Sequence, residues 1–137
     1  KPGSRVFINE VMNSTFFIDP YSPNVLKYWM AFNDFQYDHA GDPFVGAKLG
    51  NLLIGLGYQH IKTKIFSWHL DNRHPKKRKE MFDYWLSLML SGADQLRESQ
   101  YLTDEDIQAA VKEMKEVQKN PNAVFMYSFM QAEATIL

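Results

Sequence analysis

The sequence predicts an α/β fold built around one small sheet. Runs at the two ends of the 137-residue chain, 5–12 and 123–135, are rich in β-branched and aromatic residues and apolar on both alternating faces. Between them lie three stretches with apolar residues at helical spacing and one shorter alternating run, 60–68. We therefore expect three strands, of which the last returns antiparallel, with helices above and below the sheet.

Composition places the chain among soluble globular proteins, as a single domain over residues 1–137. Apolar residues make up 45% of it and the net charge is -1, which gives no electrostatic signal for nucleic acid. The short basic run 76–79 is interpreted as the exposed start of a helix. The absence of cysteine excludes disulfides, thiolate metal sites and a cysteine nucleophile, and it fits a reducing compartment. Because no stretch reaches the roughly 20 apolar residues that span a bilayer and no signal peptide is seen, we expect a cytoplasmic protein without a membrane partner.

The first strand is the element on which the others depend. Pro2 and Gly3 form a turn signal, and the strand that follows, Arg5 to Met12, is expected to be covered on both faces. Such a strand needs helices above and below it and a neighbour at its edge. In open α/β sheets, ligands bind beyond the carboxyl ends of the strands, so residues 10–17 mark the expected place of a site.

A long connection with weak periodicity follows at 13–40. It contains a rigid turn at 19–24 and residues 25–32 that could form a short helix. Connections this long in a compact domain are usually functional, so we interpret it as a lid or a binding loop.

The next helix has clear boundaries. Asp42 suits its N-cap, Pro43 its first position and Gly57 the residue after its end. Its apolar residues form one stripe: Val45, Leu49, Leu52, Leu53 and Leu56. Three glycines lie within it: Gly46, Gly50 and Gly55. Each weakens a helix by roughly 1 kcal/mol relative to alanine, so close packing against the sheet is the expected compensation.

The run 60–68 alternates as a strand with one wetter face. Lys62, Lys64 and Phe66 share one side of it, which favours a position near a sheet edge.

Two further helices precede the last strand. Pro75 begins the first of them, which is expected to end near Glu98. Residues 103–106 resemble a capping box with aspartate in place of glutamate, and an amphipathic helix follows until 120–122 stops it. The chain then ends with the apolar strand 123–135.

Four stretches resemble, in order and spacing, the second half of class I S-adenosylmethionine-dependent methyltransferases. Residues 1–10 resemble the "L-K-P-G-G" segment and the fifth strand of that family. Residues 41–58 resemble the glycine- and leucine-rich helix of its small-molecule members, and 61–66 the strand after that helix. Residues 120–132 resemble the final antiparallel strand, which slots back into the sheet.

The resemblance implies the C-terminal half of a Rossmann-like methyltransferase sheet. It implies methyl transfer from S-adenosylmethionine to a small hydrophobic or aromatic molecule, with this chain as the substrate-binding half. The family holds this cofactor mainly through a glycine-rich loop in its first half, and no G-x-G-x-G occurs here. We therefore expect the chain alone to be inactive and to need the missing N-terminal half or a second copy in a homodimer.

The candidate catalytic residues are Glu10 and His39. Glu10, at the carboxyl end of the first strand, is placed to orient a substrate hydroxyl or amine, or else to bind a neighbouring loop amide. His39 is the best candidate for a general base, with a surface or capping role as the alternative. The other histidines lack the spacing of a zinc site.

The candidate substrate-binding residues lie in the long connection and in the helix after Pro75. They are Asn13, Phe16, Phe17, Tyr21, Tyr28, Trp29, Phe35, Tyr37, Tyr84, Trp85 and Met89. For the aromatic residues of the connection, a small core beneath it is an equally good interpretation. For the last three, core packing is the simplest one.

Two other interpretations stay open. The chain could be a non-catalytic α/β interaction module that dimerises through exposed sheet edges or helices. It could also be an unrelated α+β binding domain, in which the first strand is parallel to no neighbour.

Overall fold

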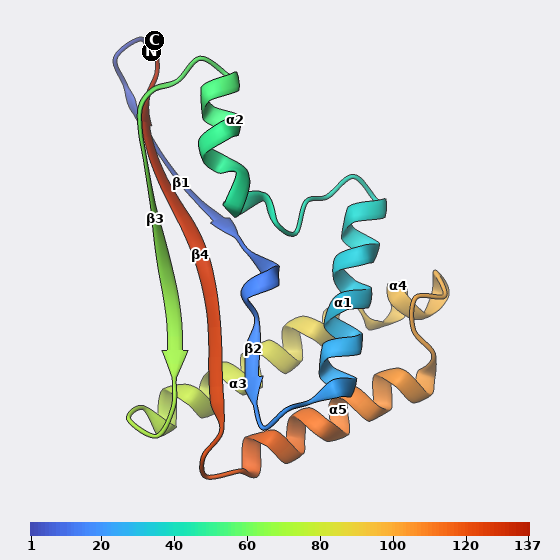
Figure 1. Ribbon diagram of the computed structural model, residues 1–137. Helices are drawn as coiled ribbons and strands as arrows, with labels where there is room; N and C mark the ends of the chain where they lie inside the picture. Colours follow the sequence, from blue (N-terminus) through green and yellow to red (C-terminus); the bar gives the residue numbers. More distant parts are fainter. The chain divides into compact units, whose positions relative to one another are not determined.

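The computed structural model describes all 137 residues and has a mixed α/β fold with five helices and one four-stranded antiparallel sheet (Figure 1). In chain order the elements are β1 (Arg5–Val11), β2 (Phe17–Asp19), α1 (Pro23–Asp38), α2 (Leu49–Gly55), β3 (Gln59–Leu70), α3 (Pro75–Ser91), α4 (Ala93–Glu98), α5 (Asp104–Lys119) and β4 (Val124–Thr135). Short 3-10 turns occur at Asn13–Thr15 and Val45–Lys48. No helix is both long and apolar enough to span a bilayer.

The chain forms two compact units. Unit 1 comprises Lys1–Phe16, Asp42–Trp68 and Tyr127–Leu137; unit 2 comprises Phe17–Gly41 and His69–Met126. Unit 1 contains β1, α2, most of β3 and most of β4. Unit 2 contains β2, the start of β4 and the four remaining helices.

In unit 1, β4 is the central strand. It pairs antiparallel with β1, in a register that runs from Arg5↔Thr135 to Val11↔Phe129, and it also pairs with β3. β1 and β3 run in the same direction with β4 between them (Figure 1). The predicted antiparallel return of the last strand is confirmed. β1 lies at the end of the strand order, so its other edge has no neighbour in this chain.

One face of this sheet is covered by α2. Leu49 and Leu53 of α2 pack with Ala132 and Ala134 of β4 in a small buried cluster. Apolar residues of the strands and of the α2–β3 turn complete it: Val6, Ile8, Tyr58, Ile61 and Met130. The alternation of β1 and β4 therefore places every second side chain against the helix.

Gly46 allows the turn before α2 to approach β1 closely. A Cβ atom at this position would lie 2.7 Å from the carbonyl oxygen of Val11 and 2.8 Å from Cγ of Met12, which is closer than real Cβ contacts. The predicted close packing is confirmed at Gly46. At Gly50 and Gly55 it is wrong, because a Cβ atom there would meet nothing within 4 Å.

The opposite face of the sheet is open, and the prediction that β1 is covered on both faces is wrong for this chain. Phe7 is 71% exposed, and its β1 neighbours Arg5 and Asn9 are exposed as well. The reason is that α2 is the one helix that packs against this part of the sheet in unit 1. On this side the Phe7 ring is approached by the Arg5 guanidinium and is not covered by α2.

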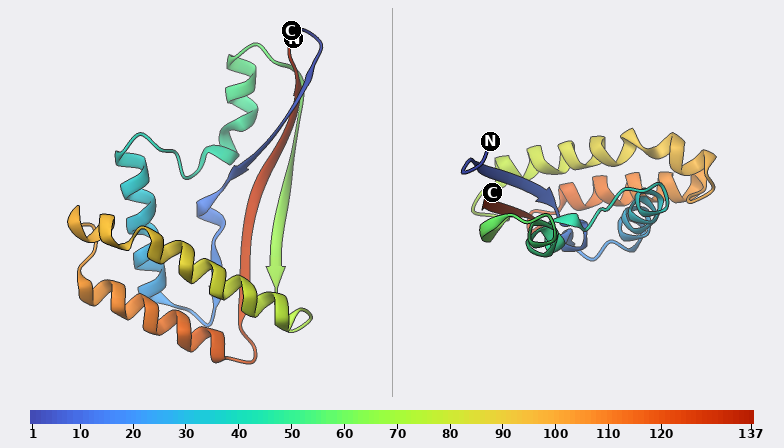
Figure 2. Two further views of the ribbon diagram at one scale, coloured as in Figure 1. Left: turned by 180° about the vertical axis from the view of Figure 1, so that it is seen from behind. Right: turned by 90° about the horizontal axis from the view of Figure 1, so that it is seen from above.

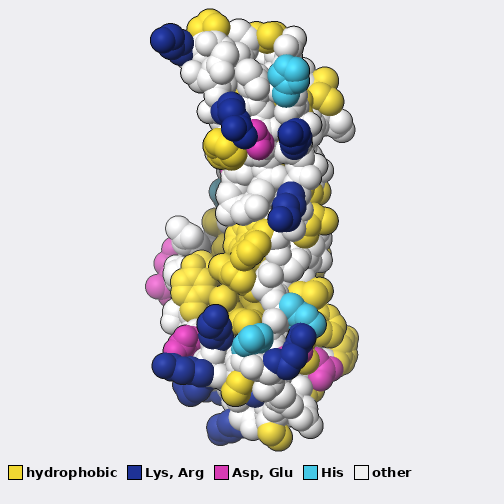
Figure 3. All heavy atoms as spheres, turned by 90° about the vertical axis from the view of Figure 1, so that its left-hand side faces the viewer, with side chains coloured by type: hydrophobic (Ala, Val, Ile, Leu, Met, Phe, Trp, Pro, Cys, Tyr) yellow, Lys and Arg dark blue, Asp and Glu magenta, His cyan; other side chains and the backbone are white.

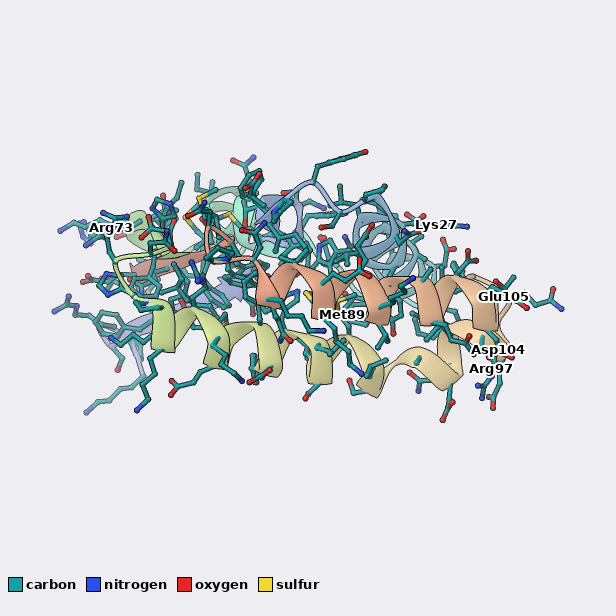
Figure 4. The ribbon with its side chains drawn as sticks, turned by 90° about the horizontal axis from the view of Figure 1, so that it is seen from below. Lys27, Arg73, Met89, Arg97, Asp104 and Glu105 are labelled. Carbon is teal, nitrogen blue, oxygen red and sulfur yellow. The ribbon has the colours of Figure 1, made fainter.

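Unit 2 is built from helices around an aromatic core. α5 packs between α1 and α3, and α4 continues from α3 (Figures 2 and 4). The short strand β2 pairs antiparallel with the first residues of β4, Phe17 opposite Met126. Trp85 is central to the core, with its ring 5.2 Å from that of Trp29 and 5.1 Å from that of Phe125.

The expectation that 13–40 is mainly an irregular connection is wrong, whereas the short helix expected at 25–32 is confirmed and is longer than expected. The segment forms a 3-10 turn, the unpredicted strand β2 and the 16-residue helix α1. Pro23 begins α1, and its buried residues include Val25, Tyr28 and Trp29. The helical period was hard to see because aromatic residues occur on its exposed face too, as Tyr37 does.

Two helix boundaries differ from the prediction. The helix after Pro75 is interrupted at Gly92, where a Cβ atom would lie 3.5 Å from the ring of Phe32, and it continues as α4. The helix before Gly57 begins at Leu49, after the 3-10 turn Val45–Lys48, and Asp42 accepts a hydrogen bond from the backbone N–H of Phe44 ahead of that turn.

Other predicted features are confirmed. Gly57 has a φ of +81° after the end of α2, as the C′ position favours. Thr103 and Asp106 form the reciprocal capping box of α5. The interpretation of 76–79 as fully exposed is wrong at one residue. Arg78 is buried and donates hydrogen bonds to the carbonyl oxygen of Ala123 and the side chain of Asn72.

Candidate functional site

The carboxyl end of β1 is held by a buried tyrosine–asparagine pair within unit 1. The hydroxyl of Tyr127 donates a hydrogen bond of 2.6 Å to Oδ1 of Asn13. The backbone N–H of Asn13 donates to the carbonyl oxygen of Pro43 at 2.9 Å. Both side chains are buried, so Asn13 is fixed in place by the strand β4 and by the segment before α2.

Tyr127 acts here as a hydrogen-bond donor. Burial raises its pKa to about 12, and a hydrogen bond from the backbone of Met12 only partly offsets this. The phenol is therefore neutral across the physiological range and keeps its proton for Asn13.

A chain of hydroxyl groups extends this network across the sheet. Thr15 Oγ1 donates to the carbonyl oxygen of Met12 at 2.7 Å and accepts the backbone N–H of Ser128 at 2.9 Å. The Ser128 hydroxyl lies 2.7 Å from that of Ser67 on β3. The polar groups after β1 are thus mutually bound, and they give this end of the strand a defined shape.

Glu10 stands just before this network. It is half-buried and lies opposite Met130 in the β1–β4 register, on the side of the sheet that α2 covers. Its carboxylate forms no hydrogen bond or ion pair with another residue, so the alternative in which it binds a loop amide is not seen in this structure. It remains able to accept a hydrogen bond from a ligand.

His39 lies in unit 2 at the end of α1. Its Nδ1 is 2.7 Å from the carbonyl oxygen of Phe35, and its ring stacks on the Phe35 ring at 4.1 Å. If Nδ1 carries the proton and donates it to that oxygen, Nε2 faces solvent as an acceptor. This geometry suits a capping residue and is also compatible with a base.

Four of the predicted substrate-binding residues meet in the core of unit 2. Tyr28, Trp29, Trp85 and Met89 are all buried, and the hydroxyl of Tyr28 donates a hydrogen bond to the carbonyl oxygen of Met89. Figure 4 shows Met89 between α3 and α5. Burial raises the pKa of Tyr28 to about 12. These side chains fill the interior of the unit, in agreement with the core interpretation.

The other predicted residues are spread over both units. Phe16 is buried in unit 1, and Phe35 is half-buried against Tyr101, 5.5 Å away. The exposed ones, all in unit 2, are Phe17, Tyr21, Tyr37 and Tyr84. None of the predicted substrate-binding residues lines either hollow of unit 1, the one beside Phe7 or the one beside Leu56.

Sequence reasoning missed a hollow on the open face of unit 1. It has a volume of about 490 Å³ and is lined by residues of all three strands: Phe7, Ile8, Asn9, Lys62, Lys64, Gln131, Ala132 and Glu133. The alternation of 60–68 had placed the two lysines on one face. What the alternation did not reveal is that β1 presents an exposed phenylalanine to the same face.

The residues present do not form a complete site for S-adenosylmethionine. At the carboxyl end of β1 the chain enters the 3-10 turn of Asn13, whose amide is engaged by Tyr127, and Gly46 lies against the strand. No glycine-rich turn offers free backbone N–H groups there. No three His, Asp or Glu side chains are grouped so that they could hold a metal ion.

No protein-family model matches the sequence, and no curated protein matches it either.

Proposed function

We propose that this chain supplies the substrate-side half of a class I S-adenosylmethionine-dependent methyltransferase that acts on a small hydrophobic or aromatic molecule. The observation that supports it best is the strand arrangement of unit 1. β4 lies antiparallel between β1 and β3, which run in the same direction, and β1 has an unpaired outer edge. The resemblance implies this arrangement. In the family, the final strand runs antiparallel and lies within the sheet, beside the strand that corresponds to β1.

The position of α2 agrees with the same proposal. It is the last element of the connection from β1 to β3, after β2 and α1, and it covers one face of the sheet, as a crossover helix between two strands of the same direction does. The missing parallel neighbour of β1 would come from the half that also carries the cofactor-binding residues. A cytoplasmic location, in keeping with the absence of cysteine, is part of this proposal.

In this proposal, Glu10 and Asn13 are the residues closest to the reaction. Glu10 has a carboxylate without a partner and would orient the hydroxyl or amine of a substrate. Asn13, held by Tyr127, would position it through its amide. His39 in unit 2 remains a candidate general base. The exposed aromatic residues of unit 2 remain candidates to line a substrate pocket.

The same open edge favours a second candidate, a non-catalytic module that pairs β1 with β1 of another copy in a homodimer. β1 also has no parallel neighbour within this chain, and this is what we expect of an unrelated α+β binding domain. These alternatives differ from the methyltransferase in what completes the sheet.

Calorimetric titration with S-adenosylmethionine separates the candidates. We expect no binding to the isolated 137 residues, and binding to a natural polypeptide or complex in which a further strand pairs with β1. Micromolar binding by the isolated chain would contradict the account of a missing half. A complete natural polypeptide that binds no cofactor and sediments as a dimer would favour the interaction module.

A further inference from the structure

The open face of unit 1 combines an apolar surface with free positive charge. Phe7 is the most exposed apolar side chain of β1, and on β3 the row of Lys62 and Lys64 continues to the exposed Phe66. Figure 3 shows the side of the molecule on which β3 lies, with Lys and Arg side chains over its upper part and hydrophobic side chains below them. The hollow of about 490 Å³ lies on this face.

The charges of the hollow do not cancel. The carboxylate of Glu133 is bound by Arg5, whose guanidinium also lies 5.2 Å from the centre of the Phe7 ring. Lys62 and Lys64 have no carboxylate within ion-pair distance and are exposed. The lining therefore carries two uncompensated positive charges beside an apolar ring, which is complementary to an occupant with both apolar and acidic side chains.

The shape of the surface favours a helix as that occupant. A sheet face that exposes aromatic side chains in an α/β fold is stabilised when a helix lies across it, as α2 does on the other face. An added strand would instead pair with the edge of β1. A helix with an apolar stripe would bury Phe7, and acidic residues along its flank would meet the two lysines.

We propose that this face is the docking surface for an amphipathic helix with acidic residues on one flank. The identity of the occupant rests on the proposed function, because the helix would belong to the polypeptide that supplies the strand beside β1. A single partner would then pair with the free edge of β1 and cover the open face of unit 1.

Two synthetic helical peptides test this. They share their length and their apolar stripe, and one carries glutamates on its flank where the other carries lysines. Fluorescence anisotropy with the full 137-residue chain should give an affinity at least tenfold higher for the acidic peptide. Amide shifts in nuclear magnetic resonance spectra should map to the strands that line the hollow.

Charge reversal provides the decisive variant. Lys62→Glu/Lys64→Glu should remove the preference for the acidic peptide, and Phe7→Ser should weaken the binding of both peptides. All three side chains are exposed, so these variants should keep their fold, which circular dichroism would check. The matched control is Lys77→Glu/Lys115→Glu, two exposed lysines of unit 2 without carboxylate partners, which should leave the preference unchanged.

Equal affinity for both peptides, or shifts that map to another surface, would overturn the docking surface. So would self-association that Lys62→Glu/Lys64→Glu abolishes, since a second copy would then be the occupant. None of these readouts involves S-adenosylmethionine. A natural polypeptide that fails to bind the cofactor would therefore overturn the proposed function and not this surface.

Discussion

Unit 2 has a closed aromatic core, whereas in unit 1 one face of the sheet is open and exposes a phenylalanine. In unit 2, the ring of Trp85 contacts those of Trp29 and Phe125 in a closed core. In unit 1, Phe7 is 71% exposed and β1 has an unpaired edge. Aromatic residues in the sequence thus have two uses. Those in the core of unit 2 stabilise the chain itself, and the exposed Phe7 of unit 1 is the one that we propose to contact a partner helix.

The largest expected effect compares one phenylalanine from each unit. Phe125 is fully buried, and its replacement by alanine removes the ring contacts with Phe82 and Trp85. Phe125→Ala should lower the free energy of unfolding by about 3–5 kcal/mol in urea denaturation. Phe7→Ala should change it by less than about 0.5 kcal/mol. Similar losses for the two variants would contradict the difference between the units.

The next effect concerns the buried arginine of α3. Arg78 donates hydrogen bonds to the carbonyl oxygens of Ala123 and Pro121 and to Asn72. Arg78→Met leaves a buried carbonyl without its donor and should cost about 1–3 kcal/mol of unfolding free energy. The neighbouring Lys77→Met should be close to neutral because that side chain is exposed. A neutral Arg78→Met would mean that the loop before β4 is held by other contacts.

A glycine pair tests how closely the turn before α2 approaches β1. Gly46→Ala forces a methyl group against the backbone of β1 and should destabilise by about 1–3 kcal/mol. Gly50→Ala places the methyl group in open space within α2, where it should stabilise by about 0.4–1 kcal/mol. Thermal unfolding of both variants measures the difference. If both alanines stabilise, the close approach at Gly46 is absent.

The smallest effect is a dependence on pH at the start of α5. The Lys27 ammonium and the backbone N–H of Thr103 hold the pKa of Asp106 below its ordinary value. A carboxylate whose folded pKa is lowered stabilises the fold above its unfolded pKa, and this stabilisation is lost as pH falls through the folded pKa. The melting temperature should therefore fall below about pH 4, and less steeply in Asp106→Asn. Parallel pH profiles for the two proteins would exclude this contribution.

Local sequence signals predicted where helices begin and end better than they predicted how the helices pack in the fold. Pro75, Gly57 and the Thr103–Asp106 box mark real helix ends, because proline, a positive φ and a capping side chain act within a few residues. Only residues 25–32 of the helix α1 were predicted, because aromatic residues on both of its sides obscure the period. The break between α3 and α4 at Gly92 was not predicted, because apolar residues at helical spacing continue across it.

The candidate site was predicted less completely. The position of Asn13 at the carboxyl end of β1 follows from the predicted end of that strand. Its hydrogen bond with Tyr127 could not be predicted, because it joins residues more than a hundred positions apart. Aromatic residues that fill a core and those that line a pocket have the same composition. The sequence therefore could not separate the buried Trp85 from the exposed Tyr84 as pocket candidates.

Amide hydrogen exchange of the 137-residue chain tests the unpaired edge of β1 most directly. β4 pairs with β1 over residues 129–135 and also pairs with β3, so its amides should exchange slowly. In β1, every second amide points away from β4, and we predict alternating fast and slow exchange from Arg5 to Val11. Uniform slow exchange along β1 in the monomeric chain would show that its edge is already paired and would contradict the incomplete sheet.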